Sequence, residues 1–177
     1  MLINKFKLLL KHLWFDASDA QRAMAPDMLE RLTKRVAASE SRHTGQIRIC
    51  VEAALPLSYL WRLGADYSLA QVIRQRGVMM FGKLRLWDTE RNNGVLIYLL
   101  LAERAIEIVA DRGVNHEVSA QQWQAITQNM ASAFKNKQFE DGLTQAIGEV
   151  TSVLVAYFPS AHNDKAANEL PDEPVLS

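Results

Sequence analysis

The sequence predicts an α/β fold in which a small mixed β-sheet is sandwiched between helices. Three observations support this fold class. Residues 95–101 form an unbroken apolar run, as in a strand that is covered on both faces. Residues 46–52 alternate apolar and polar side chains with a period of two, as in a half-buried strand. Several other segments repeat apolar residues every three or four positions, which is typical of amphipathic helices.

The composition narrows the class of protein. The chain has 177 residues, of which 49% are hydrophobic and 23% charged, as expected of one globular domain. Its 20 basic residues balance its 20 acidic residues, so no net field attracts a polyanion and we expect no nucleic-acid partner. The single cysteine, Cys50, excludes an intramolecular disulfide and lies in an alternating run where a small buried side chain fits.

The N-terminal residues 1–16 predict a short basic amphipathic helix. Lysines interrupt its apolar stretch, which argues against a signal peptide, and no later run is long enough for a membrane-spanning helix. The helix either caps the domain by packing Phe6 and Leu10 onto it, or attaches to an anionic membrane surface or to the groove of a protein partner. We therefore expect a cytoplasmic location, with attachment to the inner face of the membrane as the second alternative.

The central part of the chain predicts a helix, a strand and a second helix. Pro26 suits the first position of a helix that ends near Ser41. Strand 46–52 follows, and Ser68 is a suitable N-cap for a helix over residues 69–84. A helix between strands 46–52 and 95–101 favours a parallel pair with a right-handed crossover.

The rest of the chain predicts a hairpin, two helices and a tail. Strand 105–110 follows strand 95–101 after a connection too short for a crossover, so it should return antiparallel. Helices are expected over residues 119–134, opened by a capping box, and 139–157. The single domain should then cover residues 17–158, and residues 159–177, with few core-forming side chains, should form a flexible tail.

The predicted hairpin also suggests a cluster of oxygen ligands. It brings the segment before strand 95–101, with Asp88 and Asn93, to the same end of the sheet as Asp111. Carboxylate and amide oxygens suit Ca²⁺ or Mg²⁺ better than Zn²⁺, and no organic cofactor is expected. The alternative interpretation is that these residues only form the turns at the strand ends, where Asp, Asn and Gly are common.

Three segments carry a resemblance to a known family: Arg42-His-Thr-Gly-Gln-Ile-Arg-Ile49, Trp87-Asp-Thr-Glu-Arg-Asn-Asn-Gly-Val-Leu-Ile-Tyr-Leu-Leu-Leu101 and Ile106-Glu-Ile-Val-Ala-Asp-Arg-Gly113. Over roughly residues 27–157 the chain resembles the TPM domain family. The resemblance implies a mixed sheet between helices. It also implies a divalent-cation cleft beside the sheet, described for bacterial members, and an acid phosphatase activity, described for plant members linked to photosystem II repair.

Carried onto this chain, the cleft positions implied by the resemblance are Asp88, Asn93 and Asp111, with Glu52 joining from the end of strand 46–52. Two functions follow as hypotheses. The first is a TPM-like binding or assembly module that takes a divalent cation. The alternative is a weak metal-assisted phosphatase acting on phosphate monoesters, in which Asp88 and Asp111 hold the metal and a bound water attacks. We rank the phosphatase hypothesis second because the sequence contains no evident nucleophile or tuned general base. The sequence does not specify a small-molecule ligand for either hypothesis.

Overall fold

The computed structural model describes most of the chain, namely residues 2–64, 67–136, 138–160 and 168–177; within these, the side chains of residues 2–5, 17, 129–132 and 135 are left aside. The elements follow one another in the order α1 (Leu2–Trp14), α2 (Ala17–Ala23), α3 (Pro26–Glu40), β1 (Gln46–Glu52), α4 (Leu57–Leu60), α5 (Leu69–Lys83), β2 (Gly94–Leu100), β3 (Ala105–Ala110), α6 (Arg112–Glu117), α7 (Ala120–Lys135), α8 (Phe139–Tyr157) and β4 (Val175–Leu176).

The four strands form one mixed sheet in the order β3-β2-β1-β4. β1 and β2 are parallel, with Ile47 beside Val95, as expected for two strands joined through a helix. β2 and β3 are antiparallel, with Ile97 beside Ile108, and form the predicted hairpin. The α/β fold with a mixed sheet between helices, predicted from the sequence, is therefore confirmed.

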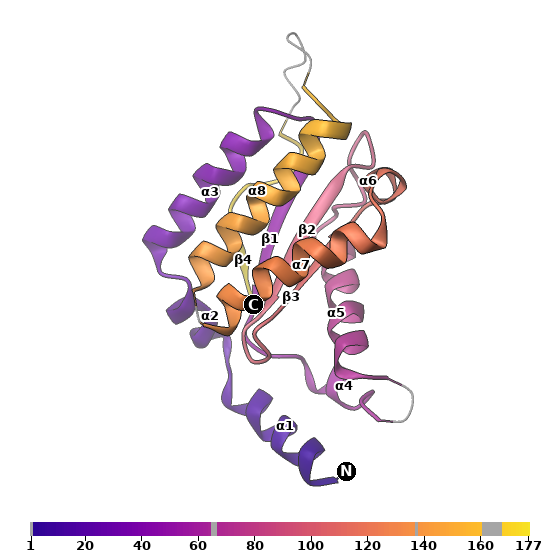
Figure 1. Cartoon of the computed structure of the whole chain (residues 1–177). Coiled ribbons are helices and arrows are strands. Elements are labelled where there is room, and N and C mark those ends of the chain that lie inside the picture. Colours follow the sequence, from indigo (N-terminus) through magenta and orange to yellow (C-terminus); the bar gives the residue numbers. More distant parts are fainter. Residues whose placement is uncertain (1, 65–66, 137, 161–167) are drawn as a thin grey trace.

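Helices cover the sheet on both faces (Figure 1). One face packs against α2, α3, α7 and α8, and the other against α4 and α5. Strand β1 is buried along its whole length, so the prediction of a half-buried strand is wrong. The polar members of its alternating pattern are buried as well: Cys50 and Glu52 lie on the α4 and α5 side, where Arg76 of α5 pairs with Glu52, and Arg48 donates to the Pro171 carbonyl of the C-terminal segment.

The predicted starts of the main helices agree with the structure. Pro26 is the first residue of α3, where its missing N–H costs nothing. The Ser68 hydroxyl accepts from the Gln71 amide at 3.3 Å, which forms a capping box for α5. Ser119 plays the same part for α7, since its hydroxyl accepts from the Gln122 amide at 3.3 Å.

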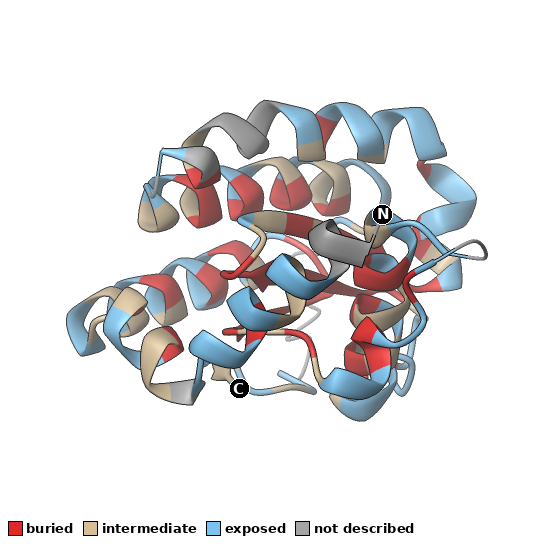
Figure 2. Cartoon of the chain, turned by 90° about the horizontal axis from the view of Figure 1, so that it is seen from below, coloured by how far each residue is buried: buried red, intermediate tan, exposed pale blue. Residues whose placement is uncertain are grey.

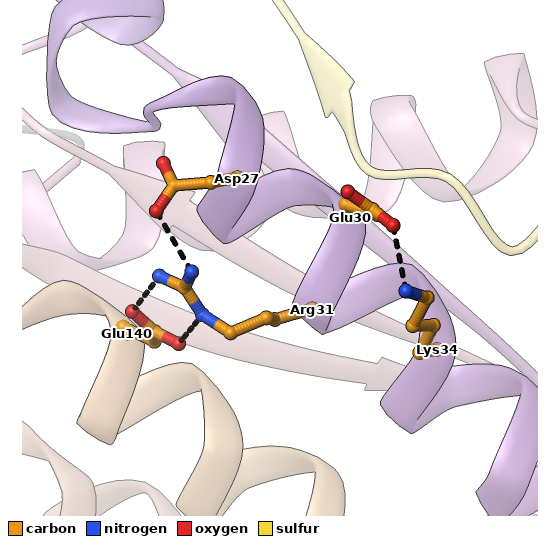
Figure 3. Close-up of polar contacts among 5 residues, drawn as sticks. All are labelled: Asp27, Glu30, Arg31, Lys34 and Glu140. Carbon is orange, nitrogen blue, oxygen red and sulfur yellow. Dashed lines mark hydrogen bonds and ion pairs between the residues drawn. The ribbon is translucent and has the colours of Figure 1, made fainter.

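Helices α3 and α8 lie side by side and are joined at their surface by a forked ion pair (Figure 3). Arg31 of α3 donates from Nε and Nη2 to the two carboxylate oxygens of Glu140 in α8, at 2.6 and 2.8 Å. It also donates from Nη1 to Asp27 at 2.8 Å, one turn earlier in its own helix. The bidentate geometry fixes how the two helices meet.

The C-terminal segment is not the flexible tail that the sequence suggested, within the part that is described. Residues 175–176 form β4, which pairs parallel with β1 opposite Cys50 and Val51. Further back, the Gln46 side-chain oxygen accepts from the amides of Glu169 and Leu170, each at 3.0 Å. The backbone of this segment thus hydrogen-bonds to the edge of β1 that β2 leaves unpaired. The sequence prediction missed this order because it considered only how few apolar side chains the segment contains. Residues 161–167 lie outside the described part.

Helix α1 is amphipathic, as predicted, but it packs with a different face. Leu8 and Leu9 contact the cluster on the α4 and α5 side, whereas Phe6 and Leu10 are exposed. The buried His12 fixes which side of α1 faces the domain, because its ring bonds to the Leu55 amide and to the Glu103 carboxylate. No described helix is both long enough and apolar enough to cross a membrane.

Candidate site at the entrance of the hairpin

Two loops meet at the end of the β2–β3 hairpin that lies far from its turn, in the upper part of Figure 1 near α6. The Asp111 amide donates to the Gly94 carbonyl at 2.9 Å, continuing the ladder by one residue. Beyond it the Gly113 amide donates to the Asn92 carbonyl at 3.0 Å. The structure therefore brings the Asn92–Gly94 segment against the Asp111–Gly113 segment, as the predicted hairpin required.

Two glycines of these segments lie against neighbouring backbone, Gly113 against Asn92 of the other segment and Gly94 against Leu86 of the preceding loop. A Cβ atom at Gly94 would lie 2.3 Å from the Leu86 carbonyl oxygen, and one at Gly113 would lie 2.5 Å from the Asn92 carbonyl oxygen. Asn92 itself has a positive φ of 52°, a conformation that asparagine tolerates better than most residues. Its side-chain oxygen accepts from Arg112 Nε and Nη2 at 3.1 and 2.9 Å, which locks the two segments together.

Asn93 is fully buried at this junction. Its backbone amide donates to the Thr89 hydroxyl at 3.1 Å, and its side-chain Nδ2 donates to the Thr44 hydroxyl at 3.3 Å. Its Oδ1 atom is buried and has no hydrogen-bond partner. A buried amide oxygen without a donor is costly, so an orphaned oxygen here calls for an explanation.

Asp111 follows β3 and caps α6. Its Oδ1 accepts from the Arg112 amide at 2.7 Å, while its Oδ2 is buried without a partner. Two adjacent segments thus each carry one buried side-chain oxygen that no donor satisfies. These two oxygens, one amide and one carboxylate, form the candidate site.

Asp88 lies on the surface of the loop that leads to Asn93. Its carboxylate is exposed, 4.0 Å from the guanidinium of Arg85, and its backbone amide donates to the Arg85 carbonyl at 3.0 Å. It therefore belongs to the same loop as the candidate site, with its oxygen atoms in solvent.

Glu52 does not join the other three residues, and the expectation that it would is wrong. The parallel register places Glu52 beside Leu100 and Gln46 beside Gly94, so Glu52 lies at the other end of the sheet, ~20 Å along the strand. There its carboxylate accepts from Arg76 Nε at 2.8 and 3.1 Å. The predicted parallel pairing already implied this result. Parallel neighbours place their C-terminal ends together, so Glu52 at the end of β1 lies beside the end of β2, whereas Asn93 precedes the start of β2.

Two hydroxyl groups at the site were missed by sequence reasoning. Thr44 comes from the turn before β1 and Thr89 from the loop before β2, and both bond to Asn93. Nothing in the spacing of the sequence links position 44 to position 93. A parallel pairing of the following strands does link them, because Gln46 beside Gly94 leaves the preceding residues next to each other.

The donor types at the site restrict what it can hold. Within the described residues, no group of three or more histidine, cysteine, aspartate or glutamate side chains is placed to hold a metal. The orphaned oxygens come from one carboxylate and one amide, the ligand types of Ca²⁺ and Mg²⁺. The buried thiol of Cys50 is no alternative centre, because burial raises its pKa to about 12 and keeps it protonated.

A separate groove of about 750 Å³ runs beside the edge strand β3. Its lining includes Arg74, Glu107, Asn115 and Trp123, and it extends toward the hairpin turn at Arg104. Neither Asn93 nor Asp111 belongs to its lining. The groove and the pair of buried oxygens are therefore distinct features.

Comparison with known proteins agrees with this architecture. The solved structures that resemble the chain include the NMR structure of the BA42 protein from the psychrophilic bacterium Bizionia argentinensis, with a TM-score of 0.70 and 23% sequence identity. The similarity covers 87% of this chain and 95% of BA42, and it shows the fold. Among curated proteins none matches the chain. The family model described as the TPM domain matches residues 17–153. With most of its length matched, the chain belongs to the TPM domain family.

Proposed function

We propose that this TPM domain is a binding module that takes up a divalent cation, Ca²⁺ or Mg²⁺, between Asn93 and Asp111. The observation that supports the proposal is the pair of buried oxygens without donors, Asn93 Oδ1 and Asp111 Oδ2. Buried polar atoms in folded proteins are nearly always paired, so two unpaired acceptors in adjacent segments favour a positively charged partner.

The chemistry of the neighbouring groups supports a hard cation. Ca²⁺ and Mg²⁺ prefer oxygen ligands and complete their coordination with water and carbonyl or hydroxyl oxygens. The hydroxyls of Thr44 and Thr89 already bond to Asn93. Thr89 holds the backbone of Asn93 and Thr44 holds its side-chain amide, so that the amide oxygen would be presented to the ion without further reorganisation.

The proposal is tested by titrating the purified protein with Ca²⁺ and then Mg²⁺ while recording amide NMR spectra. Saturable shifts centred on Asn93 and Asp111 are expected, together with a rise in melting temperature, because a ligand that binds only the folded state stabilises it. An absence of saturable shifts in these two segments would overturn the proposal.

One variant removes the charge and leaves the local fold intact. Asp111→Asn keeps a side chain that caps α6 about equally well, so the metal-free protein should remain folded. Its affinity for Ca²⁺ should fall at least about tenfold, because affinity depends on ligand charge. The matched control is Asp141→Asn, which removes an exposed carboxylate from α8 and should leave the affinity unchanged.

Asp88→Asn decides whether the exposed carboxylate of the same loop takes part. An affinity equal to that of the wild type would restrict the site to the two buried oxygens. A loss comparable to that of Asp111→Asn would add Asp88 as a third ligand, with its loop closing over the ion. In either case the proposal requires that Asp111→Asn lower the affinity for Ca²⁺.

A further inference from the structure

Helix α1 exposes an apolar surface that the domain does not use. Phe6 is 63% exposed and Trp14 is 84% exposed, and Leu10 and Leu13 of the same helix are also exposed. At 100° per residue these four side chains share one side of α1. Leu8, Leu9 and His12 occupy the opposite side and face the domain.

The helix is held firmly in this orientation. The Nδ1 atom of His12 accepts from the Leu55 amide at 3.0 Å, so its Nε2 atom carries the hydrogen that it donates to Glu103 at 3.0 Å. Lys11 donates to the same carboxylate at 3.1 Å. Since these bonds attach α1 to the loop before α4 and to the hairpin turn, the exposed apolar side cannot turn inward without breaking them.

Helix α4 and the residue after it also expose large apolar side chains. Trp61, directly after α4, is 69% exposed, and Leu57 at the start of α4 is also exposed. Both α1 and α4 lie at the lower end of the molecule in Figure 1, and Figure 2 looks onto this end. We call the side chains Phe6, Leu10, Leu13, Trp14, Leu57 and Trp61 the lower face.

Positive charge accompanies the lower face. Residues 2–14 contain three lysines and no acidic residue, although the whole chain has no net charge. Lys7 and Lys11 are both exposed on the flank of α1 next to the apolar side chains, and Lys11 also pairs with Glu103. Aromatic and aliphatic residues bordered by lysines are typical of helices that lie in the interface of an anionic bilayer.

We propose that the lower face docks onto the surface of an anionic lipid bilayer. The apolar side chains of α1 would enter the interface between headgroups and acyl chains, and Lys7 would contact the lipid phosphates. A second copy of the chain fits less well, because a symmetric contact would bring the same lysines together.

The test is co-sedimentation of the full chain with lipid vesicles. Binding is expected to phosphatidylcholine vesicles that contain about 30% phosphatidylglycerol, and should weaken in raised salt and on vesicles of phosphatidylcholine alone. Phe6→Ser/Trp14→Ser should weaken binding at least about tenfold, since it removes the two largest side chains that would enter the lipid. Both side chains are exposed, so the fold should be unaffected, which thermal unfolding checks.

The matched control is Trp87→Ser. Trp87 is 54% exposed and follows the C-terminal end of α5, whereas α4 precedes the N-terminal end of that helix. The Trp87→Ser variant should bind anionic vesicles as strongly as the wild type does. Equal loss in this control, or no binding of the wild type to anionic vesicles, would overturn the proposal. A dimer in solution that Phe6→Ser/Trp14→Ser abolishes would also overturn it, in favour of a second copy as the occupant.

Discussion

Tyr98 of β2 donates its hydroxyl hydrogen to the Glu52 carboxylate of β1 at 2.5 Å, inside the layer between the sheet and α5. Arg76 of α5 pairs with the same carboxylate and also lies over the ring of Tyr59. Burial, followed by the nearby Glu52 charge, raises the pKa of Tyr98, so its hydroxyl keeps its hydrogen and can donate it. The carboxylate that the family resemblance implied as a metal ligand therefore bonds to Tyr98 and Arg76 within the protein.

This arrangement predicts a large effect of removing Arg76. Arg76→Met leaves the Glu52 charge buried without its cation, and should lower the free energy of unfolding by about 3–5 kcal/mol. Tyr98→Phe removes one hydrogen bond to a charged group and should cost about 1.5–3 kcal/mol. Urea unfolding measures both.

The control for these variants is Lys34→Met. Lys34 pairs with Glu30 on the surface of α3 (Figure 3), and both side chains are exposed, so the loss should be much smaller than that of Arg76→Met. If Arg76→Met cost no more than Lys34→Met, the buried pair would contribute nothing beyond a surface contact.

The fold could be predicted from the sequence where one local signal determined one element. The apolar run of β2, the short hairpin connection to β3 and the capping residues Ser68 and Ser119 each act within a few positions of the chain. Such signals do not depend on distant partners. Element order and strand direction follow from them, because a short connection forces an antiparallel return and a helical one allows a parallel pair.

The site and the faces of the sheet could be predicted only in part, because they depend on distant segments. The alternation in β1 suggested that one face of this strand is exposed to solvent. Instead α5 packs on that face and β4 pairs with the edge of the strand. A two-residue strand such as Val175–Leu176 has no periodicity to detect. The loop pairing of Asn93 and Asp111 followed from the hairpin, whereas the position of Glu52 depended on the parallel register.

A buried histidine predicts that acid destabilises the fold. Burial lowers the pKa of His43 to about 4. The ring lies between the Ser39 hydroxyl at 2.8 Å and the Gly45 carbonyl at 3.1 Å, where the neutral form with hydrogen on Nδ1 satisfies both. Since the unfolded chain takes up a proton near pH 6.5 and the folded chain only near pH 4, stability falls as pH falls between these values, by about 3 kcal/mol.

His43→Gln should flatten this part of the stability curve, measured by urea unfolding at a series of pH values. The comparison is the slope between pH 6.5 and 4 for variant and wild type. His116→Gln is the control, because it makes the same substitution at an exposed histidine of α6. Equal slopes for wild type and His43→Gln would show that folding does not lower the pKa of His43, and would contradict this prediction.

Glu40 predicts the opposite dependence on pH. Burial, and then the charge of Asp172, raise the pKa of the Glu40 carboxyl to about 8, while one of its oxygens accepts from the Ile47 amide at 2.7 Å. The folded chain therefore holds a proton that the unfolded chain loses near pH 4.5. Stability should fall as pH rises from about 4.5 to about 8, on the order of 2 kcal/mol because the residue is only partly buried.

Glu40→Gln imitates the protonated acid and keeps the oxygen that accepts from Ile47. The variant should be more stable than the wild type at pH 8 and similar to it at pH 5, as measured by thermal unfolding. A variant less stable than the wild type at pH 8 would mean that the carboxyl is ionised in the folded protein and that its charge stabilises the fold.

Two glycines of α8 predict opposite effects of the same substitution. A Cβ atom at Gly142 would lie 2.8 Å from the ring of Phe134, which is fully buried and packs near Phe139. Gly142→Ala should therefore cost about 1–3 kcal/mol by overpacking. Gly148 is exposed on the same helix with nothing within 4 Å of its Cβ position, so Gly148→Ala should stabilise by about 0.5–1 kcal/mol through helix propensity.

Urea unfolding of the two variants checks both signs with the same change in chemistry and the same helix. A second substitution isolates the cause of the loss at Gly142. Phe134→Leu shortens the side chain that the new methyl group meets, so Gly142→Ala should cost less in that background than in the wild type. If the cost were the same in both backgrounds, the ring of Phe134 would not be what requires glycine at position 142.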